Sequence, residues 1–270
     1  MLLFLDIYAK MRPMEITVVV ITYNEEDRLE AALQSVQAVA SEIVVIDRHS
    51  TDNTLDVAKK YTDRIYSRDW TNYADQKNFG NVQATFPWIL SLDADERLSP
   101  ELREEILKLR SEEPAVAAFS MPRQACYLGK WIRHSGWYPD RKIRLFRKDR
   151  ARWEGEYVHE SLVVDGEVKK LKGVLYHFTY RDMSDQVKRL NLYSSLGAQS
   201  LYARQKKCRG YHLMCMPFLA FLRSFFWKAG VLDGLAGFII AIFQGYGVFL
   251  KYAKLREIWK KGERIEPFPN

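Results

Sequence analysis

The fold class follows from one stretch, ITVVVITYNEE at residues 16–26. Residues 16–21 are all β-branched, which is typical of a strand buried on both faces of a parallel sheet. A polar and acidic group follows at once, at the point where the strand must end. Because open α/β sheets bind ligands outside the carboxyl ends of their strands, this junction predicts a site as well as a strand.

The same pattern recurs along the next seventy residues. Apolar runs at 43–46 (IVVI) and 88–92 (WILSL) each end in an aspartate, Asp47 and Asp93. Helical patterns and one short strand lie between the runs, at 29–36, 52–61, near Ile65 and at 73–85. The alternation predicts an α/β fold with a doubly wound, mostly parallel sheet and helices on both faces.

The pattern changes after residue 115. Short alternating or aromatic-rich segments over 115–180 predict a mixed extension of the sheet, and a helix is expected from Met183 to Ala203. Residues 211–228 and 231–256 are strongly apolar.

Asp93 and Asp95 stand two residues apart at a predicted strand end, in LSLDADE (90–96). Two carboxylates with this spacing can reach one hard divalent cation, which in turn can bridge a diphosphate. The alternative is an acidic turn that caps the helix beginning near Ser99. The short motif alone does not decide between the two.

Four motifs in fixed order carry a resemblance to a known family: ITYNEE (21–26), IDRHSTDNT (46–54), QKNFG (76–80) and LSLDADE (90–96). Together they resemble the nucleotide-binding half of the family-2 glycosyltransferases, which have the GT-A fold, over about residues 15–180. The stretch GWYPDRKIRLFRKDRARWEGEYVHESL (136–162), HFTY (177–180) and the tail segments GVLDGLAGF and FLKYAKL are similar to the lipopolysaccharide-core β-glucosyltransferase branch. This extends the resemblance almost to residue 256.

The resemblance implies a donor site for a uridine diphosphate sugar. Asp47 would accept the uracil imide hydrogen, Lys77 would lie near the diphosphate, Asp93 would contact the ribose or donor sugar, and Asp95 would bind Mg²⁺ or Mn²⁺. The uridine pocket would be lined by Thr22, Tyr23, Asn24 and Glu25. The commoner family pattern after the second strand is Asp, a small or acidic residue, Gly, Ser; here Arg48 and His49 replace the middle two.

Inversion requires a base that takes the proton of the acceptor hydroxyl as this attacks the anomeric carbon. We expect Glu160 to be that base, with Asp140 as the second choice; a salt bridge to a nearby arginine is the alternative role for Glu160. His177, in preference to His159, is expected as a further metal ligand or diphosphate contact, against the alternative of a packed, hydrogen-bonded histidine.

Two groups of side chains leave the choice between structure and function open. Trp131, Trp137 and Trp153 fit sugar stacking or a protein core equally well. Residues 141–152 hold seven basic side chains against one acid, Asp149, which suits either a solvated strand face or a phosphate-rich acceptor.

The net charge of +7 belongs to the C-terminal part of the chain. From residue 200 onward there are 12 Lys and Arg against 4 Asp and Glu, which leaves 29 against 30 in residues 1–199. These basic residues flank 17 uncharged residues, 234–250, a length that is marginal for crossing a hydrocarbon core of about 30 Å. We therefore expect helices that lie in or on the membrane surface, with a soluble helical hairpin or a dimer interface as alternatives.

The predicted organisation is an N-terminal extension (1–14), a GT-A catalytic domain (15–205) and a basic, apolar helical tail (206–270) that associates with a membrane. Within the catalytic domain, 15–100 would bind the nucleotide sugar and 101–205 would form the acceptor side. Three cysteines without a CxxC pair indicate neither a disulfide framework nor a zinc site, and the N-terminus lacks the basic region and cleavage site of a signal peptide.

We therefore expect an inverting glycosyltransferase that moves a hexose, glucose by resemblance, from a UDP-sugar to a lipid-linked saccharide such as the lipopolysaccharide inner core. Its place would be the cytoplasmic face of the inner membrane, peripheral or monotopic, with no nucleic-acid partner. A nucleotidyltransferase would need a Gly-rich basic loop after the first strand, where this chain is acidic. A scaffold without turnover is the other alternative, and the sequence makes no prediction about oligomeric state.

Overall fold

The computed structural model describes residues 13–111, 114–155 and 160–261. The chain forms two compact units. The first unit contains the chain up to Arg123 and then Asp140–His177, and the second contains Gln124–Pro139 and the chain from Phe178 onward. One long strand, β6 (Ala118–Tyr127), contributes to both units.

Four parallel strands form the first half of the sheet in the first unit, in the order β3-β2-β1-β4. They are β1 (Ile16–Thr22), β2 (Glu42–Asp47), β3 (Ile65–Ser67) and β4 (Trp88–Asp93). The register pairs Thr22 with Asp47 and Ile21 with Asp93, so these strands end at one edge. The predicted parallel sheet is confirmed, and the polar residues that follow its strands lie along one edge.

Antiparallel pairs extend the sheet beyond β4, as the pattern after residue 115 predicts. The extension begins with β8 (Asp140–Arg147), which pairs with β4 and β6, and ends with β12 (Leu175–Phe178) and β5 (Glu96–Leu98). Two short strands, β7 (Lys130–Trp131) and β11 (Val168–Lys170), pair with β6, while β9 (Ala151–Glu154) and β10 (Ser161–Val164) form a separate ribbon. The β5–β12 register places His177 opposite Glu96.

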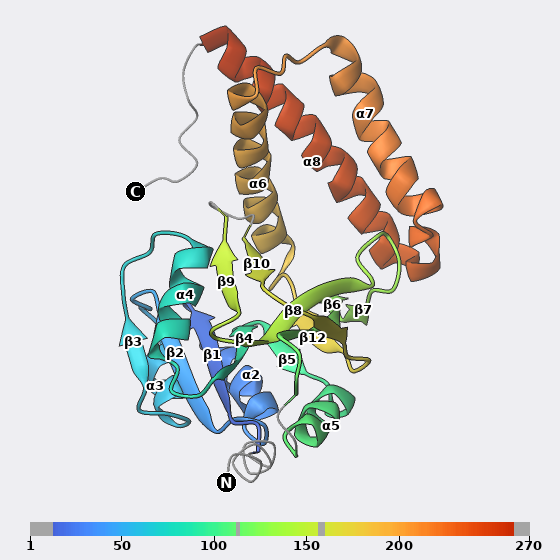
Figure 1. Ribbon diagram of the computed structural model, residues 1–270. Coiled ribbons are helices and arrows are strands. Elements are labelled where there is room, and N and C mark those ends of the chain that lie inside the picture. Colours follow the sequence, from blue (N-terminus) through green and yellow to red (C-terminus); the bar gives the residue numbers. More distant parts are fainter. Residues whose placement is uncertain (1–12, 112–113, 156–159, 262–270) are drawn as a thin grey trace, which may run out of the picture. The chain divides into compact units, whose positions relative to one another are not determined.

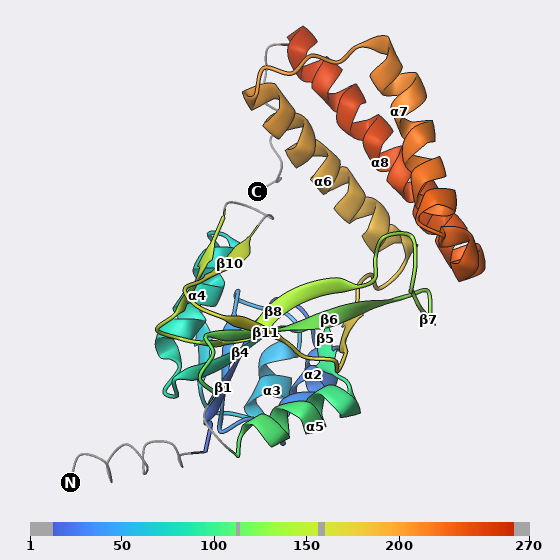
Figure 2. The ribbon, with the colours of Figure 1, turned by 45° about the vertical axis from the view of Figure 1, so that its right-hand side comes forward.

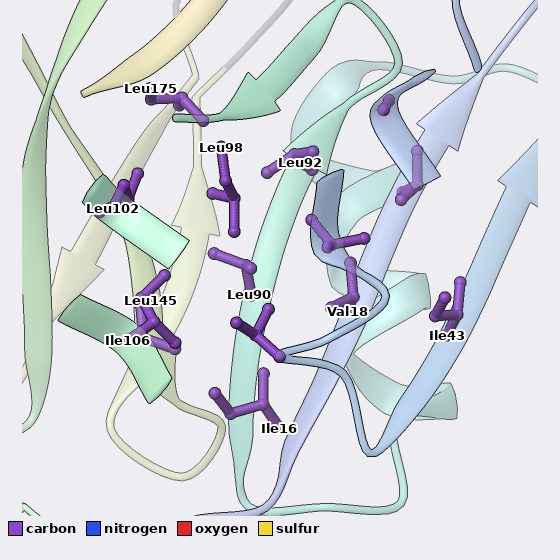
Figure 3. Packing of buried hydrophobic residues seen from close by; sticks show 14 of the residues in the cluster. Ile16, Val18, Ile43, Leu90, Leu92, Leu98, Leu102, Ile106, Leu145 and Leu175 are labelled. Atoms are coloured by element: carbon purple, nitrogen blue, oxygen red, sulfur yellow. The ribbon is translucent and has the colours of Figure 1, made fainter. Parts of the chain in front are cut away.

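Helices cover both faces of the parallel strands (Figure 1). On one face, α2 (Leu29–Val36), α3 (Thr54–Lys59) and α5 (Pro100–Leu109) share a core with the strands. Figure 3 shows Leu102 and Ile106 of α5 directed toward Leu90 and Leu145 of the sheet. Alternate residues of β1 enter the cores on the two faces, which explains why its sequence is apolar without a break.

The other face is covered by α4 (Tyr73–Gln83), which packs very closely on β1. A Cβ atom on Gly80 would lie 2.4 Å from Cγ1 of Val19, so only glycine allows this approach. Lys77 precedes Gly80 by three residues on the same helix and therefore lies close above the sheet. The QKNFG motif thus has a packing role at Gly80 and a site role at Lys77.

The second unit is dominated by three helices, α6 (Met183–Ala203), α7 (Gly210–Leu222) and α8 (Gly234–Lys261), which Figure 2 shows side by side. A π-helical turn, Arg223–Trp227, and a 3₁₀ turn, Gly230–Asp233, join α7 to α8. Lys254 of α8 donates to Ser194 and Ser195 of α6, each at 2.8 Å. The helix predicted over Met183–Ala203 is confirmed at those bounds, and it packs in this unit with the apolar helices.

Candidate active site

The first part of the site is the turn that follows β2. Asp47 is fully buried, and its two carboxylate oxygens accept hydrogen bonds from the backbone nitrogen of Ser50 at 2.8 Å and from the Ser50 hydroxyl at 2.5 Å. His49 has a φ of 54°, which lies in the left-handed region. The commoner family pattern has glycine at this position. The histidine thus adopts a backbone conformation that favours glycine, and Ser50 still bonds to Asp47 across the turn.

The loop after β1 is held against this turn by hydrogen bonds. The backbone nitrogens of Asn24 and Glu25 donate to the hydroxyls of Ser50 (2.9 Å) and Thr54 (2.8 Å). Thr22 is buried, and its hydroxyl has no hydrogen-bond partner among the described residues. A buried hydroxyl without a partner at this edge is suited to meet a ligand.

Tyr23 projects from the same loop and is 46% exposed. The Cζ atom of Arg48 lies 4.9 Å from the centre of the Tyr23 ring and also 4.9 Å from the centre of the Trp70 ring. Trp70 in turn makes an edge contact with Tyr73, at 4.7 Å between ring centres, at the start of α4. The four predicted uridine-pocket residues thus lie together with Asp47 at the ends of β1 and β2.

Lys77 links the next two predicted residues. Its side chain is 1% exposed, and Nζ lies 3.1 Å from Oδ1 of Asp93 and 3.2 Å from Oε1 of Glu160. The ammonium group also lies 4.5 Å from the centre of the Trp153 ring, which is itself buried. The structure therefore brings together a cation, the strand-end aspartate and the expected base.

Arg144 of β8 completes the surroundings of Asp93. Its Nη2 donates to Asp93 Oδ2 at 2.6 Å and to Glu96 Oε1 at 2.7 Å, and Glu96 Oε2 accepts the backbone nitrogen of Asp93 at 3.2 Å. Burial disfavours the charged form of Asp93, but the cations of Arg144 and Lys77 outweigh it and hold the pKa of this carboxyl well below its usual range. Asp93 is therefore a fixed anion.

Asp95 lies on the turn between β4 and β5, and its Oδ2 is 3.4 Å from Nε2 of His177. The β5–β12 pairing, which places His177 beside Glu96, makes this approach possible. Both side chains are largely buried, at 14% and 19% exposure. No cluster of three or more His, Cys, Asp or Glu side chains fit to hold a metal occurs among the described residues, so Asp95 and His177 form a pair.

Asp140, the second expected base, has both oxygens engaged. Oδ2 accepts from Nε (3.1 Å) and Nη2 (2.6 Å) of Arg123, and Oδ1 lies 3.2 Å from Nζ of Lys142. Arg123 also donates to Glu96 at 3.1 Å. Burial raises and the two cations lower the pKa of Asp140, and the cations prevail.

The remaining predicted residues lie partly within this site and partly outside it. His159 falls outside the described residues. Trp153 packs against Phe146 in the core of the first unit, whereas Trp131 contacts Phe178 and Trp137 contacts Tyr127 in the second. The basic run divides, because Arg144 points into the site while Arg150 and Arg152 are exposed.

Sequence reasoning did not single out three buried charged residues of this network, Glu96, Arg123 and Arg144. Glu96 is the last residue of the LSLDADE motif, and its position three residues after the end of β4 was the available signal. Arg144 was one of seven basic residues in a run. Only the alternation of side chains between the two faces of a strand separates it from its neighbours. Nothing in the sequence points to Arg123.

Two solved structures are similar to this chain over most of its length. The mannosyltransferase PcManGT of Pyrobaculum calidifontis aligns with a TM-score of 0.49 at 14% identity, covering 94% of this chain and 89% of that one. The TarS fragment of S. aureus aligns with a TM-score of 0.46 at 16% identity, covering 93% of each chain.

Relatives found by sequence share a higher identity with this chain than these two structures do. The lipopolysaccharide core biosynthesis glycosyltransferase LpsC of Rhizobium meliloti is 33% identical, covering 87% of this chain and 90% of the relative. A glycosyltransferase of Rickettsia typhi is 30% identical over 93% of this chain and 90% of its own length. The model of the glycosyl transferase family 2 matches residues 17–162, from β1 through Glu160. The chain therefore belongs to glycosyl transferase family 2 and is a glycosyltransferase with the GT-A fold.

Proposed function

We propose that the protein is an inverting hexosyltransferase that transfers a sugar, glucose, from a UDP-sugar to a lipid-linked saccharide such as the lipopolysaccharide inner core. The observation that carries the proposal is the arrangement around Lys77. A buried cation lies within 3.2 Å of both the strand-end Asp93 and the carboxylate of Glu160. In this proposal Lys77 supplies a phosphate-binding charge, Asp93 a sugar-binding acid and Glu160 a general base, and their short distances support these roles.

Asp47 and Thr22 support uridine as the nucleoside. The Asp47 carboxylate is buried and anchored by Ser50, yet each oxygen retains a lone pair that can accept the imide hydrogen of uracil. Thr22 supplies a buried hydroxyl that lacks a protein partner among the described residues. The exposed ring of Tyr23 offers a face on which a base can stack.

Asp95 and His177 fit a divalent cation, Mg²⁺ or Mn²⁺. Two ligands at about 2.1 Å from one ion and at right angles to each other lie about 3 Å apart, close to the 3.4 Å between Asp95 Oδ2 and His177 Nε2. A carboxylate oxygen and an imidazole nitrogen are an accepted donor set for Mn²⁺. When bound there, such an ion would neutralise charge on the leaving diphosphate.

The chemistry assigned to the chain is a single displacement. Glu160 takes the proton from the acceptor hydroxyl, whose oxygen forms a bond to the anomeric carbon as the bond from that carbon to the diphosphate oxygen breaks. The electron pair of the broken bond leaves with the diphosphate, toward which Lys77 directs its positive charge. Attack opposite the leaving group inverts the configuration of the anomeric carbon.

Glu160 is a better base than Asp140 in this site. One Glu160 oxygen contacts Lys77, and no described side chain hydrogen-bonds to the other, so it is available to a hydroxyl. Asp140 has both oxygens paired with cations, and the lowered pKa that results makes it a weaker proton acceptor. Asp140 also reaches Asp93 only through Arg123, Glu96 and Arg144.

A lipid-linked acceptor is supported by the apolar helices of the second unit. None of the thirteen residues of α7 is buried, although its sequence, GYHLMCMPFLAFL, is almost entirely apolar. Of the described residues, one segment, Gly230–Lys261, is long and apolar enough to cross a membrane. Apolar helices with basic ends suit the surface of an anionic leaflet, and LpsC is named for lipopolysaccharide core biosynthesis.

Calorimetric titration with UDP, with and without Mn²⁺, tests the proposal on the wild type and Asp95→Ala. We expect binding that the metal tightens in the wild type and that Asp95→Ala makes independent of the metal. A folded wild type that binds UDP under neither condition would contradict the donor assignment. Binding without transfer to any lipid-linked saccharide would instead favour a scaffold role.

A further inference from the structure

Arg48 occupies a position where the commoner family pattern has a small or acidic residue, and the structure gives it defined surroundings. Its guanidinium carbon lies 4.9 Å from the centres of both the Tyr23 and Trp70 rings. Contacts of this kind fix the plane of a guanidinium group while leaving its edge accessible. Arg48 is therefore held in orientation by two rings.

The backbone around Arg48 is fixed as well. Its amide nitrogen donates to the carbonyl oxygen of Thr22 at 3.1 Å. The next residue, His49, lies 3.2 Å from Asp69 through Nε2, and the amide of Arg68 donates to the carbonyl oxygen of Asp47 at 3.0 Å. The segment that carries Trp70 is thus attached to the same turn.

The donors of the Arg48 guanidinium are not used within the described protein. Five N–H groups in a planar fork are available, and no hydrogen bond joins them to any residue that the structure describes. Arg48 is only half-buried, so its edge can meet a ligand. An oriented fork with free donors is the form in which arginine recognises carbonyl and phosphate oxygens.

The residue before Arg48 provides the complementary group. Asp47 is a buried acceptor, so the end of β2 presents an acceptor and a donor on consecutive residues. An imide such as that of uracil presents the matching pair, an N–H donor beside a carbonyl acceptor. Cytosine presents the reverse, a ring nitrogen acceptor beside an amino donor.

We propose that Arg48 determines base specificity by donating to the O4 carbonyl of uracil, next to the imide N–H that Asp47 accepts. This inference rests on the proposed UDP-sugar donor and deepens it. Bound cytosine would set two donors against each other at Arg48 and two acceptors at Asp47, and unpaired polar groups of this kind are strongly rejected. An arginine fork that pairs with a base edge discriminates against the wrong base by roughly 5- to 150-fold.

Titration of the full-length protein with UDP and with CDP tests this, because the two nucleotides share the ribose and the diphosphate. The wild type should bind UDP more than tenfold more tightly than CDP. Arg48→Ser, which restores a small residue, should reduce that preference by roughly tenfold, mainly by weakening UDP. Arg48→Lys should also lose preference, since an ammonium group lacks the planar fork.

Arg152→Ser is the matched control, because it removes an exposed arginine of the same unit that has no part in the surroundings of Arg48. It should keep the wild-type preference for UDP. Equal weakening of UDP and CDP by Arg48→Ser, with uridine binding unchanged, would show that Arg48 binds the diphosphate and would overturn the proposal. An unchanged UDP/CDP ratio would overturn it too, while a wild type that binds neither nucleotide would refute the donor assignment itself.

Discussion

Nζ of Lys77 lies 3.2 Å from Oε1 of Glu160, although 83 residues separate the two in the chain. The same nitrogen contacts Asp93. From Asp93 a series of side chains with alternating charge continues within the first unit to Asp140, the second expected base. The full series is Glu160, Lys77, Asp93, Arg144, Glu96, Arg123, Asp140 and Lys142. The two expected bases thus lie near opposite ends of one network. Glu160 is connected to Asp93 through Lys77 alone, whereas Asp140 is connected to it through three other side chains.

This difference predicts unequal effects of removing the two carboxylates. Glu160→Gln keeps the shape and the contact with Lys77 but cannot accept a proton, so we expect turnover to fall by about 10²–10⁴-fold. Asp140→Asn should change turnover by less than tenfold. Initial rates of sugar transfer measure both, and titration with UDP should give wild-type affinity for each variant.

Two results would contradict the assignment. Near-normal turnover of Glu160→Gln together with inactive Asp140→Asn would make Asp140 the base. Loss of UDP binding in Glu160→Gln would show that this residue supports the donor site rather than the proton transfer.

Arg144 is predicted to be essential for stability, because it neutralises two acids at once. Its side chain is 4% exposed and lies within 2.7 Å of both Asp93 and Glu96. Arg144→Met leaves a buried carboxylate without its main partner, and breaking a buried pair costs about 3–5 kcal/mol of unfolding free energy. Urea unfolding followed by circular dichroism measures this.

Arg152→Met is the control for that substitution, since Arg152 is exposed on β9 and belongs to the same basic run. Its unfolding free energy should stay within about 0.5 kcal/mol of the wild type. If both variants lose the same stability, the buried pairs of Arg144 are not the cause.

Asp140 predicts how stability depends on pH. Burial disfavours its charge, yet Arg123 and Lys142 outweigh this and lower the pKa in the folded state below its ordinary value of 3.8. The folded carboxyl therefore binds a proton less readily than the unfolded one, so its stabilisation is fully present above that value and is lost as the pH falls through the folded pKa. Unfolding of the wild type and Asp140→Asn should differ most near neutral pH and converge in acid; a constant difference would contradict the pairing.

Sequence pattern was sufficient for β1 to β4 and the helices between them, because each apolar run ends in a polar residue, but it did not predict the short strand β5. The run ending at Thr22, the run ending at Asp47 and the run ending at Asp93 became neighbouring parallel strands with their ends aligned. Local periodicity predicts such elements, and the alternation of strands and helices along the chain predicts that the strands pair in parallel.

The network around Asp93 could not be predicted in the same way, because its partners come from distant parts of the chain. Arg144 reaches Asp93 only because β8 pairs antiparallel with β4, and His177 reaches Asp95 only because β12 pairs with β5. Strand pairing of this range leaves no periodic signal in either segment. The single basic residue that turns inward from the run at 141–152 was for that reason indistinguishable from its neighbours.

The exposed apolar side chains in the turn after α7 and at the start of α8 predict binding to an anionic membrane surface. Trp227 is 88% exposed and Leu235 is 75% exposed, and basic residues stand near them at Arg223 and Lys228. Removing the two large apolar side chains in Trp227→Ser, Leu235→Ser should weaken binding to vesicles by well over tenfold, since each buried side chain contributes about 1.5–3 kcal/mol.

Val82→Ser is the matched control for this variant, because Val82 is 70% exposed and belongs to the first unit, whereas the apolar helices belong to the second. Sedimentation with vesicles should show the control bound like the wild type, with binding stronger to vesicles that contain anionic lipid and weaker at high salt. Because the substitutions lie at exposed positions, the double variant should keep wild-type UDP affinity in solution. Two outcomes would show that the apolar surface binds a second protein chain instead of lipid. One is vesicle binding that is unchanged in the double variant, and the other is a wild type that is dimeric while the double variant is monomeric.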